Sequence, residues 1–145
     1  MENRKEKAMS FFRDGYNCSQ AVVMAFSDLL PYSEEELARM ACSFGGGVGQ
    51  MREVCGTVTG MALTAGLLDG FAKPADHNEK IAHYKRIQTL GNEFREANGS
   101  VVCRELLAMQ KTTDGSVKKR PCVELCGLAV EILEQHLSDF GAGQA

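Results

Sequence analysis

The sequence has no run of apolar residues long enough to cross a membrane. Its most apolar stretch, residues 54–68, is too short for a spanning helix and is rich in glycine and threonine. The charged residues 1–7 are not followed by the apolar core of a signal peptide. We therefore expect a cytoplasmic protein without direct membrane insertion.

Positive charge is not in excess either. The chain has 16 Lys and Arg residues against 19 Asp and Glu, for a net charge of -3 at pH 7. The basic run at residues 118–120 is too short to indicate more than a solvated loop. Because proteins that bind nucleic acid usually carry a basic patch, the sequence predicts no nucleic-acid partner.

Strand-like alternation of apolar and polar residues is almost absent, and most segments have helical periodicity instead. We predict an all-α fold in which residues 1–145 form a single helical domain. This domain is a compact bundle of five or six helices with a glycine-rich loop before the central helix. The main predicted segments are an N-terminal helix over residues 1–14, helices over 18–30, 52–68, 77–97 and 101–109, a last helix from Pro121, a polar loop over 112–119 and a frayed tail over 140–145.

Two short patterns indicate where early helices begin. Asn17 is a good N-cap for the helix that starts at Cys18. Ser33 is a second N-cap, and Glu36 stands at the capping-box position three residues later.

The glycine-rich loop precedes the central helix. Four of the five residues 45–49 are glycine, which permits positive φ angles and close approach of other groups. The loop could bind a phosphate through its N–H groups. It lacks the Gly-Lys-Ser/Thr ending of a P-loop and follows a helix, so a tight turn is the favoured interpretation. Gly56 and Gly60 share one face of the next helix and let another backbone pack closely.

Six cysteines are many for a chain of this length. In a reducing compartment they indicate redox chemistry or metal binding more than structural disulfides. Four of them fall in the first turns of predicted helices: Cys18, Cys55, Cys103 and Cys122. Unpaired N–H groups and the helix dipole favour the thiolate there, so we expect lowered thiol pKa values, with Cys55 the most activated.

The use of this cluster depends on convergence of the four helix starts in space. Two thiols could cycle between dithiol and disulfide, or four thiolates could hold zinc or an iron–sulfur cluster. The four lie far apart in the chain and contain no Cys-x-x-Cys pair, which weighs against a common structural zinc module. Cys42 is predicted to be structural, and Cys126 either packs or pairs with Cys122 one turn away.

The motifs around these cysteines form one pattern over nearly the whole chain, from about Gly15 to Leu133. It consists of Tyr-Asn-Cys-Ser-Gln-Ala-Val around Cys18, Phe-Gly-Gly-Gly-Val-Gly at residues 44–49, Cys55-Gly56-x-x-x-Gly60, and then Cys103 and Cys122. This pattern resembles the redox-active protein family named C_GCAxxG_C_C.

The resemblance implies that the four first-turn cysteines are the cysteines of the family, with Cys42 and Cys126 extra. Where the family usually has alanine after Cys-Gly, this chain has Thr57. The resemblance also implies a functional link to a transporter, because such proteins are often encoded near transporter genes.

The leading hypothesis is a redox protein similar to a thiol–disulfide oxidoreductase, acting with an unknown redox partner. Cys55 would attack, and Cys18, Cys103 or Cys122 would resolve the bond or form a second pair. The alternatives are a zinc or iron–sulfur protein that uses the same thiolates, and a non-catalytic helical adaptor in which the cysteines only pack. The apolar central helix could also support a homodimer.

Overall fold

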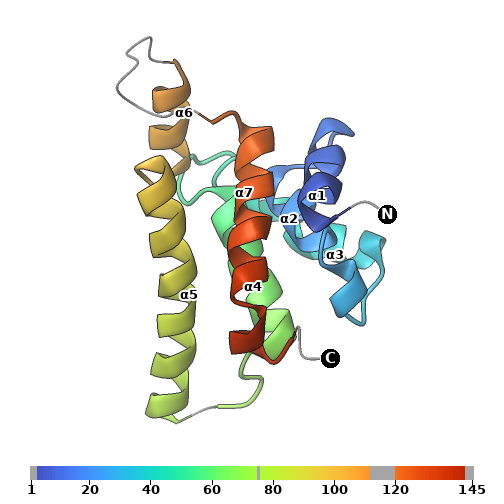
Figure 1. Ribbon diagram of the computed structural model, residues 1–145, viewed down its shortest axis with the longest axis vertical. Helices are drawn as coiled ribbons and strands as arrows, with labels where there is room; N and C mark the ends of the chain where they lie inside the picture. The colour runs from blue at the N-terminus through green and yellow to red at the C-terminus, as the bar shows by residue number, and fades with distance from the viewer. Residues whose placement is uncertain (1–2, 75, 112–119, 143–145) are drawn as a thin grey trace.

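The computed structural model describes residues 3–74, 76–111 and 120–142, and over these residues the chain is all-α, as predicted (Figure 1). The predicted loop at 112–119 lies outside the described residues. The described part contains seven α-helices, slightly more than the five or six expected, and the short helices α3 and α6 both correspond to predicted segments. The seven are α1 (Arg4–Arg13), α2 (Cys18–Met24), α3 (Glu34–Ala41), α4 (Gly56–Asp69), α5 (His77–Asn98), α6 (Cys103–Lys111) and α7 (Cys122–Gln135), with 3-10 helices η1 (Ser27–Leu29), η2 (Cys42–Phe44) and η3 (Leu137–Phe140).

Side-chain caps determine where α2 and α3 begin. The Asn17 side chain accepts a hydrogen bond from the N–H of Gln20 at 2.9 Å, and the Gln20 side chain accepts from the N–H of Asn17 at 3.0 Å. Ser33 and Glu36 form the same reciprocal pair before α3, with both bonds at 3.0 Å. Such a cap contributes about 1 kcal/mol. Both capping predictions are confirmed, and the first one positions Cys18, the residue after the cap.

The α2 helix ends at Met24, well before the predicted end of this segment. The chain then tightens into η1, whose polar residues are held by α1. Arg4 donates to the Asp28 carboxylate at 2.6 and 3.0 Å, and Lys7 donates to the Ser27 hydroxyl at 3.1 Å. Because these contacts come from another helix, the apolar periodicity of the segment could not show the break.

The α2 helix lies at the centre of the bundle and packs against α1, α3, α4 and α7. Its approach to α4 depends on a glycine. A Cβ atom at Gly60 would lie 2.9 Å from the Cβ of Val22 and 3.1 Å from the carbonyl oxygen of Ser19. Gly56, one turn earlier, faces the start of α2 in the same way. The predicted packing role of these two glycines is confirmed.

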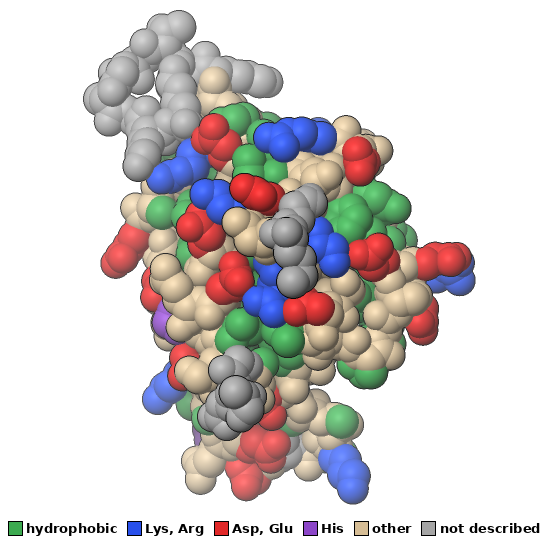
Figure 2. Space-filling view, turned by 45° about the vertical axis from the view of Figure 1, so that its right-hand side comes forward, with side chains coloured by type: hydrophobic (Ala, Val, Ile, Leu, Met, Phe, Trp, Pro, Cys, Tyr) green, Lys and Arg blue, Asp and Glu red, His purple; other side chains and the backbone are tan. Residues whose placement is uncertain are grey.

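Ion pairs join α1 to α7 at the surface. Arg4 pairs with Glu134 and Lys5 with Glu131, both at 3.0 Å. Figure 2 shows acidic and basic side chains interspersed over one face of the molecule. Exposed pairs of this kind contribute only about 0–1 kcal/mol each, so buried apolar side chains carry most of the stability of the bundle.

The C-terminal segment differs from the prediction of a frayed tail over residues 140–145. Phe140 is only 1% exposed and ends η3, whereas residues 143–145 lie outside the described residues. The η3 turn is held by His136, whose ring nitrogens face Glu93 of α5 at 2.7 Å and Asp139 at 3.2 Å. The prediction is wrong for Phe140, because the burial of its ring and the contact of His136 with Glu93 depend on segments that are distant in the chain.

Over the described part of the chain, none of the helices combines the length and the apolar character that crossing a membrane requires.

Candidate functional site

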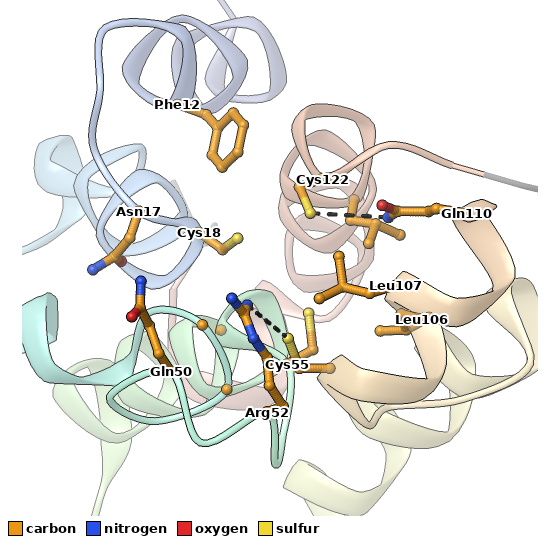
Figure 3. A pocket seen from close by; sticks show the side chains of 15 residues that line it. Phe12, Asn17, Cys18, Gln50, Arg52, Cys55, Leu106, Leu107, Gln110 and Cys122 are labelled. Carbon is orange, nitrogen blue, oxygen red and sulfur yellow. Dashed lines mark hydrogen bonds between the residues drawn. The ribbon is translucent and has the colours of Figure 1, made fainter.

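The four predicted cysteines converge on one cavity. Cys18, Cys103 and Cys122 are the first residues of α2, α6 and α7, and Cys55 is the residue immediately before α4. All four line a cavity of about 230 Å³, and Figure 3 shows Cys18 and Cys122 facing it from opposite walls. Because α4 begins at Gly56 and not at residue 52, Cys55 is an N-cap residue and not part of the first turn. The convergence is confirmed, whereas the chemical role of the four stays a prediction.

Two glycines hold backbone directly against two of these cysteines. A Cβ atom at Gly47 would lie 2.7 Å from the Cβ of Cys103, and one at Gly56 would lie 3.1 Å from the Cβ of Cys18. Any larger residue at either position would therefore push a cysteine away from its place on the cavity wall. Glycine is therefore required at these two positions because it has no side chain, and not only because its backbone is conformationally free.

The glycine-rich loop forms a left-handed turn. Five consecutive residues, from Gly46 to Gln50, have φ between 55° and 71°, and Arg52 follows with φ 62°. The N–H groups of Gln50, Arg52 and Glu53 donate to the carbonyl oxygens of residues 45, 46 and 47 at 3.0–3.1 Å. Since these amides bond within the loop, the arrangement favours the tight-turn interpretation over a phosphate site.

An isolated β-bridge joins two walls of the cavity. Val54 pairs with Val102 in antiparallel fashion. The N–H of Cys55 donates to the carbonyl oxygen of Val101 at 2.8 Å, and the N–H of Cys103 donates to that of Glu53 at 2.6 Å. The bridge therefore holds Cys55 and Cys103 as neighbours, although no alternating pattern in the sequence indicates a strand there.

Cys18 interacts with two other thiols, those of Cys122 and Cys126. The neighbouring Cys122 thiol by itself favours the Cys18 thiolate, but the neighbouring Cys126 thiol and burial outweigh it, so the pKa of Cys18 is raised. The contact with Cys18, together with burial, raises the pKa of Cys122 far above its usual value. Both residues are therefore protonated thiols at neutral pH.

Cys55 corrects the expectation of an activated thiolate. Its side chain is 4% exposed. Burial raises its pKa, although the Thr57 hydroxyl, 3.1 Å from its Sγ, and the N–H groups of Thr57 and Val58 act in the opposite direction. The helix start supplies the expected N–H groups, but removal from water has the larger effect.

The two remaining cysteines have different environments. Cys42 is exposed at the end of α3 and does not line the cavity, so its predicted structural role stays a prediction. Cys126 is 0% exposed and interacts with Cys18. The sequence had indicated that Cys126 could pair with Cys122, one turn away along α7. It did not identify Cys18 as a partner of Cys126.

Polar side chains on the cavity wall were missed by sequence reasoning. Gln50 and Gln110 line the cavity beside Arg52. Gln110 donates to the Sγ of Cys122 at 3.9 Å and to the carbonyl oxygen of Arg120 at 2.7 Å, which ties the end of α6 to the start of α7. Only Arg52 had a sequence signal, because it lies close to Cys55 in the chain.

The predicted alternative of a metal centre needs three or four converging ligands. Within residues 3–74, 76–111 and 120–142, which include all six cysteines, no three His, Cys, Asp or Glu side chains are arranged to hold a metal ion. The observed arrangement of thiols therefore fits pairwise exchange better than a zinc or iron–sulfur site.

Comparison with known proteins places this site in a family. The family model described as "Putative redox-active protein (C_GCAxxG_C_C)" matches residues 16–136. An uncharacterized protein from Archaeoglobus fulgidus is 26% identical over 147 aligned residues, which cover 95% of each chain. No solved structure matches the chain. Because the family model spans most of the sequence, including all four cavity cysteines, the chain belongs to the family C_GCAxxG_C_C.

Proposed function

We propose that the protein is a thiol–disulfide redox protein in which Cys18 and Cys122 exchange between dithiol and disulfide. The observation that carries this proposal is that both thiols line one cavity together with the other two family cysteines, and that they lie near enough to affect each other's pKa. Thiols that served only for packing would not need to line an open cavity together. The two residues also come from the starts of different helices, so a bond between them would link α2 to α7.

The exchange follows ordinary thiol–disulfide chemistry. In the proposed order Cys18 attacks first and gives up its proton. It forms a mixed disulfide with one sulfur of a substrate disulfide, and the other substrate sulfur takes up that proton and leaves as a thiol. Cys122 then attacks the Cys18 sulfur, gives up its own proton and releases the second substrate thiol. The protein dithiol is oxidised, and one substrate disulfide is reduced to two thiols.

Cys55 and Cys103 are proposed as a second pair in the same cavity. The β-bridge between Val54 and Val102 supports this assignment, because it makes the two cysteines neighbours. Arg52 donates to the Sγ of Cys103 at 3.7 Å, which places a positive charge beside that sulfur. The redox partner, the link to a transporter, the homodimer and the cytoplasmic location stay predictions.

A redox titration tests the proposal. The protein is equilibrated in thiol buffers from about -120 to -320 mV, free thiols are alkylated, and the products are counted and mapped by mass spectrometry. We expect one transition in which the wild type loses two thiols and yields a Cys18–Cys122 cross-linked peptide, distinct from any loss of thiols at Cys55 and Cys103. Cys18→Ser and Cys122→Ser should abolish that transition.

Cys42→Ser is the matched control, because Cys42 is exposed and does not line the cavity. It should leave the midpoint of the Cys18–Cys122 transition unchanged. If all thiols of the wild type remain alkylatable across the whole range of potentials, the proposed function is wrong.

A further inference from the structure

The cavity wall carries one charged side chain among the described residues, that of Arg52. Figure 3 shows its guanidinium group directed toward the middle of the cavity, with one donor bond to a cysteine sulfur. In the described part of the chain Arg52 has no carboxylate partner, whereas the next residue, Glu53, pairs with Arg104 at 2.8 Å. A positive charge beside four thiols is therefore available to an incoming anion.

The backbone around this charge is strained. Arg52 has φ 62° and Gln50 has φ 63°. A residue with a Cβ atom pays about 1–2 kcal/mol in this conformation. These two residues also line the cavity with their polar side chains. Strained residues of this kind cluster at functional sites, so the strain is a second reason to assign a binding role to this segment.

The size and the remaining lining of the cavity limit the ligand. A volume of about 230 Å³ lies below the range of about 300–1,000 Å³ that is usual for drug-sized ligands, which suits a smaller molecule. Phe12, Leu106 and Leu107 make part of the wall apolar. A small molecule with an anionic group and a short apolar stem would fit such a cavity.

We propose that the cavity binds small anionic disulfides and the thiols formed from them, with the carboxylate of the ligand on Arg52 and its sulfur facing Cys18. This inference rests on the proposed function and assigns its substrate class. Arg52 binds the carboxylate through charge-assisted hydrogen bonds. The exchange itself balances as described above: the ligand disulfide takes two electrons and two protons from the two cysteines and leaves as two thiols.

Alkylation of the reduced protein tests the anion site without any redox step. Iodoacetate and iodoacetamide have similar size and the same leaving group, but only iodoacetate carries a carboxylate. The ratio of their rates is measured by mass spectrometry at each cysteine, with the exposed Cys42 as internal reference. We expect the rate with iodoacetate, divided by the rate with iodoacetamide, to be about tenfold higher at the cavity cysteines than at Cys42. In Arg52→Gln this ratio should fall to the value at Cys42.

Arg39→Gln is the control variant, because it removes the same charge from an exposed side chain on α3. It should leave the ratios unchanged. Equal ratios in the wild type and in Arg52→Gln would overturn the anion site. Circular dichroism on each variant shows whether the fold is retained, and Arg52→Lys, which keeps the charge but loses the bidentate geometry, should retain part of the excess.

Small disulfides then test the substrate class. For each protein, the rate of oxidation by the anionic dithiodiglycolate is divided by the rate with the neutral 2-hydroxyethyl disulfide. This ratio should be about tenfold higher for the wild type than for Arg52→Gln. If the Cys18–Cys122 transition occurs but this preference is missing, the substrate class is wrong and the proposed function stands. If the iodoacetate preference is present but no disulfide forms, the anion site stands and thiol exchange is wrong.

Discussion

Replacing Gly60 by alanine tests the close packing of α2 on α4, which brings Cys18 to the cavity. In a helix interior, alanine is favoured over glycine by about 0.8–1.0 kcal/mol. At Gly66, on the same helix, a new Cβ atom meets nothing within 4 Å, so Gly66→Ala should stabilise the protein by about this amount. At Gly60 the new atom lies 2.9 Å from the Cβ of Val22 and 3.1 Å from a backbone oxygen. Overpacking of this kind costs about 1–3 kcal/mol.

The difference between the two variants isolates the packing cost, because the gain in helix propensity is common to both. Equilibrium unfolding in urea, followed by circular dichroism with excess reductant, should place Gly60→Ala about 1–3 kcal/mol below Gly66→Ala. If the free energies of unfolding of the two variants agree within about 0.5 kcal/mol, α2 does not pack as closely on α4 as the structure indicates. The explanation for Gly60 is then wrong.

Three further predictions concern single side chains. At His136, burial opposes the charged ring, but the two carboxylates that face its nitrogens raise its pKa overall. Its contribution to stability is therefore complete below the unfolded pKa of about 6.5 and is lost as the pH rises through the raised folded value. Urea unfolding at a series of pH values should show this loss in the wild type, and an identical profile for His136→Gln would contradict it. At Thr57, Thr57→Val removes the hydroxyl that lowers the pKa of Cys55, so alkylation of Cys55 at fixed pH should slow. Thr57→Ser should restore the rate, and unchanged rates in both variants would refute the argument. Phe140→Ala should lower the free energy of unfolding by about 3–5 kcal/mol, because the ring is buried. A loss below about 1 kcal/mol would mean that this segment frays.

The helices and the starts of α2, α3 and α7 could be predicted closely from the sequence, because these starts depend on neighbouring residues, whereas the predicted start of α4 was four residues early. Asn17 caps α2 through the residue three positions later, and Ser33 caps α3 in the same way. These local bonds place Cys18 at a helix start without help from the rest of the fold. The placement of Cys122 also followed from a local signal, the preceding Pro121, which precedes α7 as its N-cap residue.

The ionisation of the thiols could not be predicted in the same way. Local reasoning counted the N–H groups at each helix start and expected lowered pKa values. In the structure, burial raises the pKa of Cys55, and contact with other thiols contributes to the raised values of Cys18 and Cys122. Desolvation depends on what packs around a group, and that information comes from the whole fold.

The sequence by itself determined that the chain is helical, that it carries the four cysteines of the family pattern and that these lie at or next to helix starts. Only the tertiary structure decided which thiols meet, that Cys126 joins Cys18, and that Arg52 faces the cavity. It also decided the β-bridge at Val54 and the burial of Phe140. The reason is physical: caps and helix propensity act over a few residues, whereas contacts between distant segments and exclusion of water arise only when the helices pack.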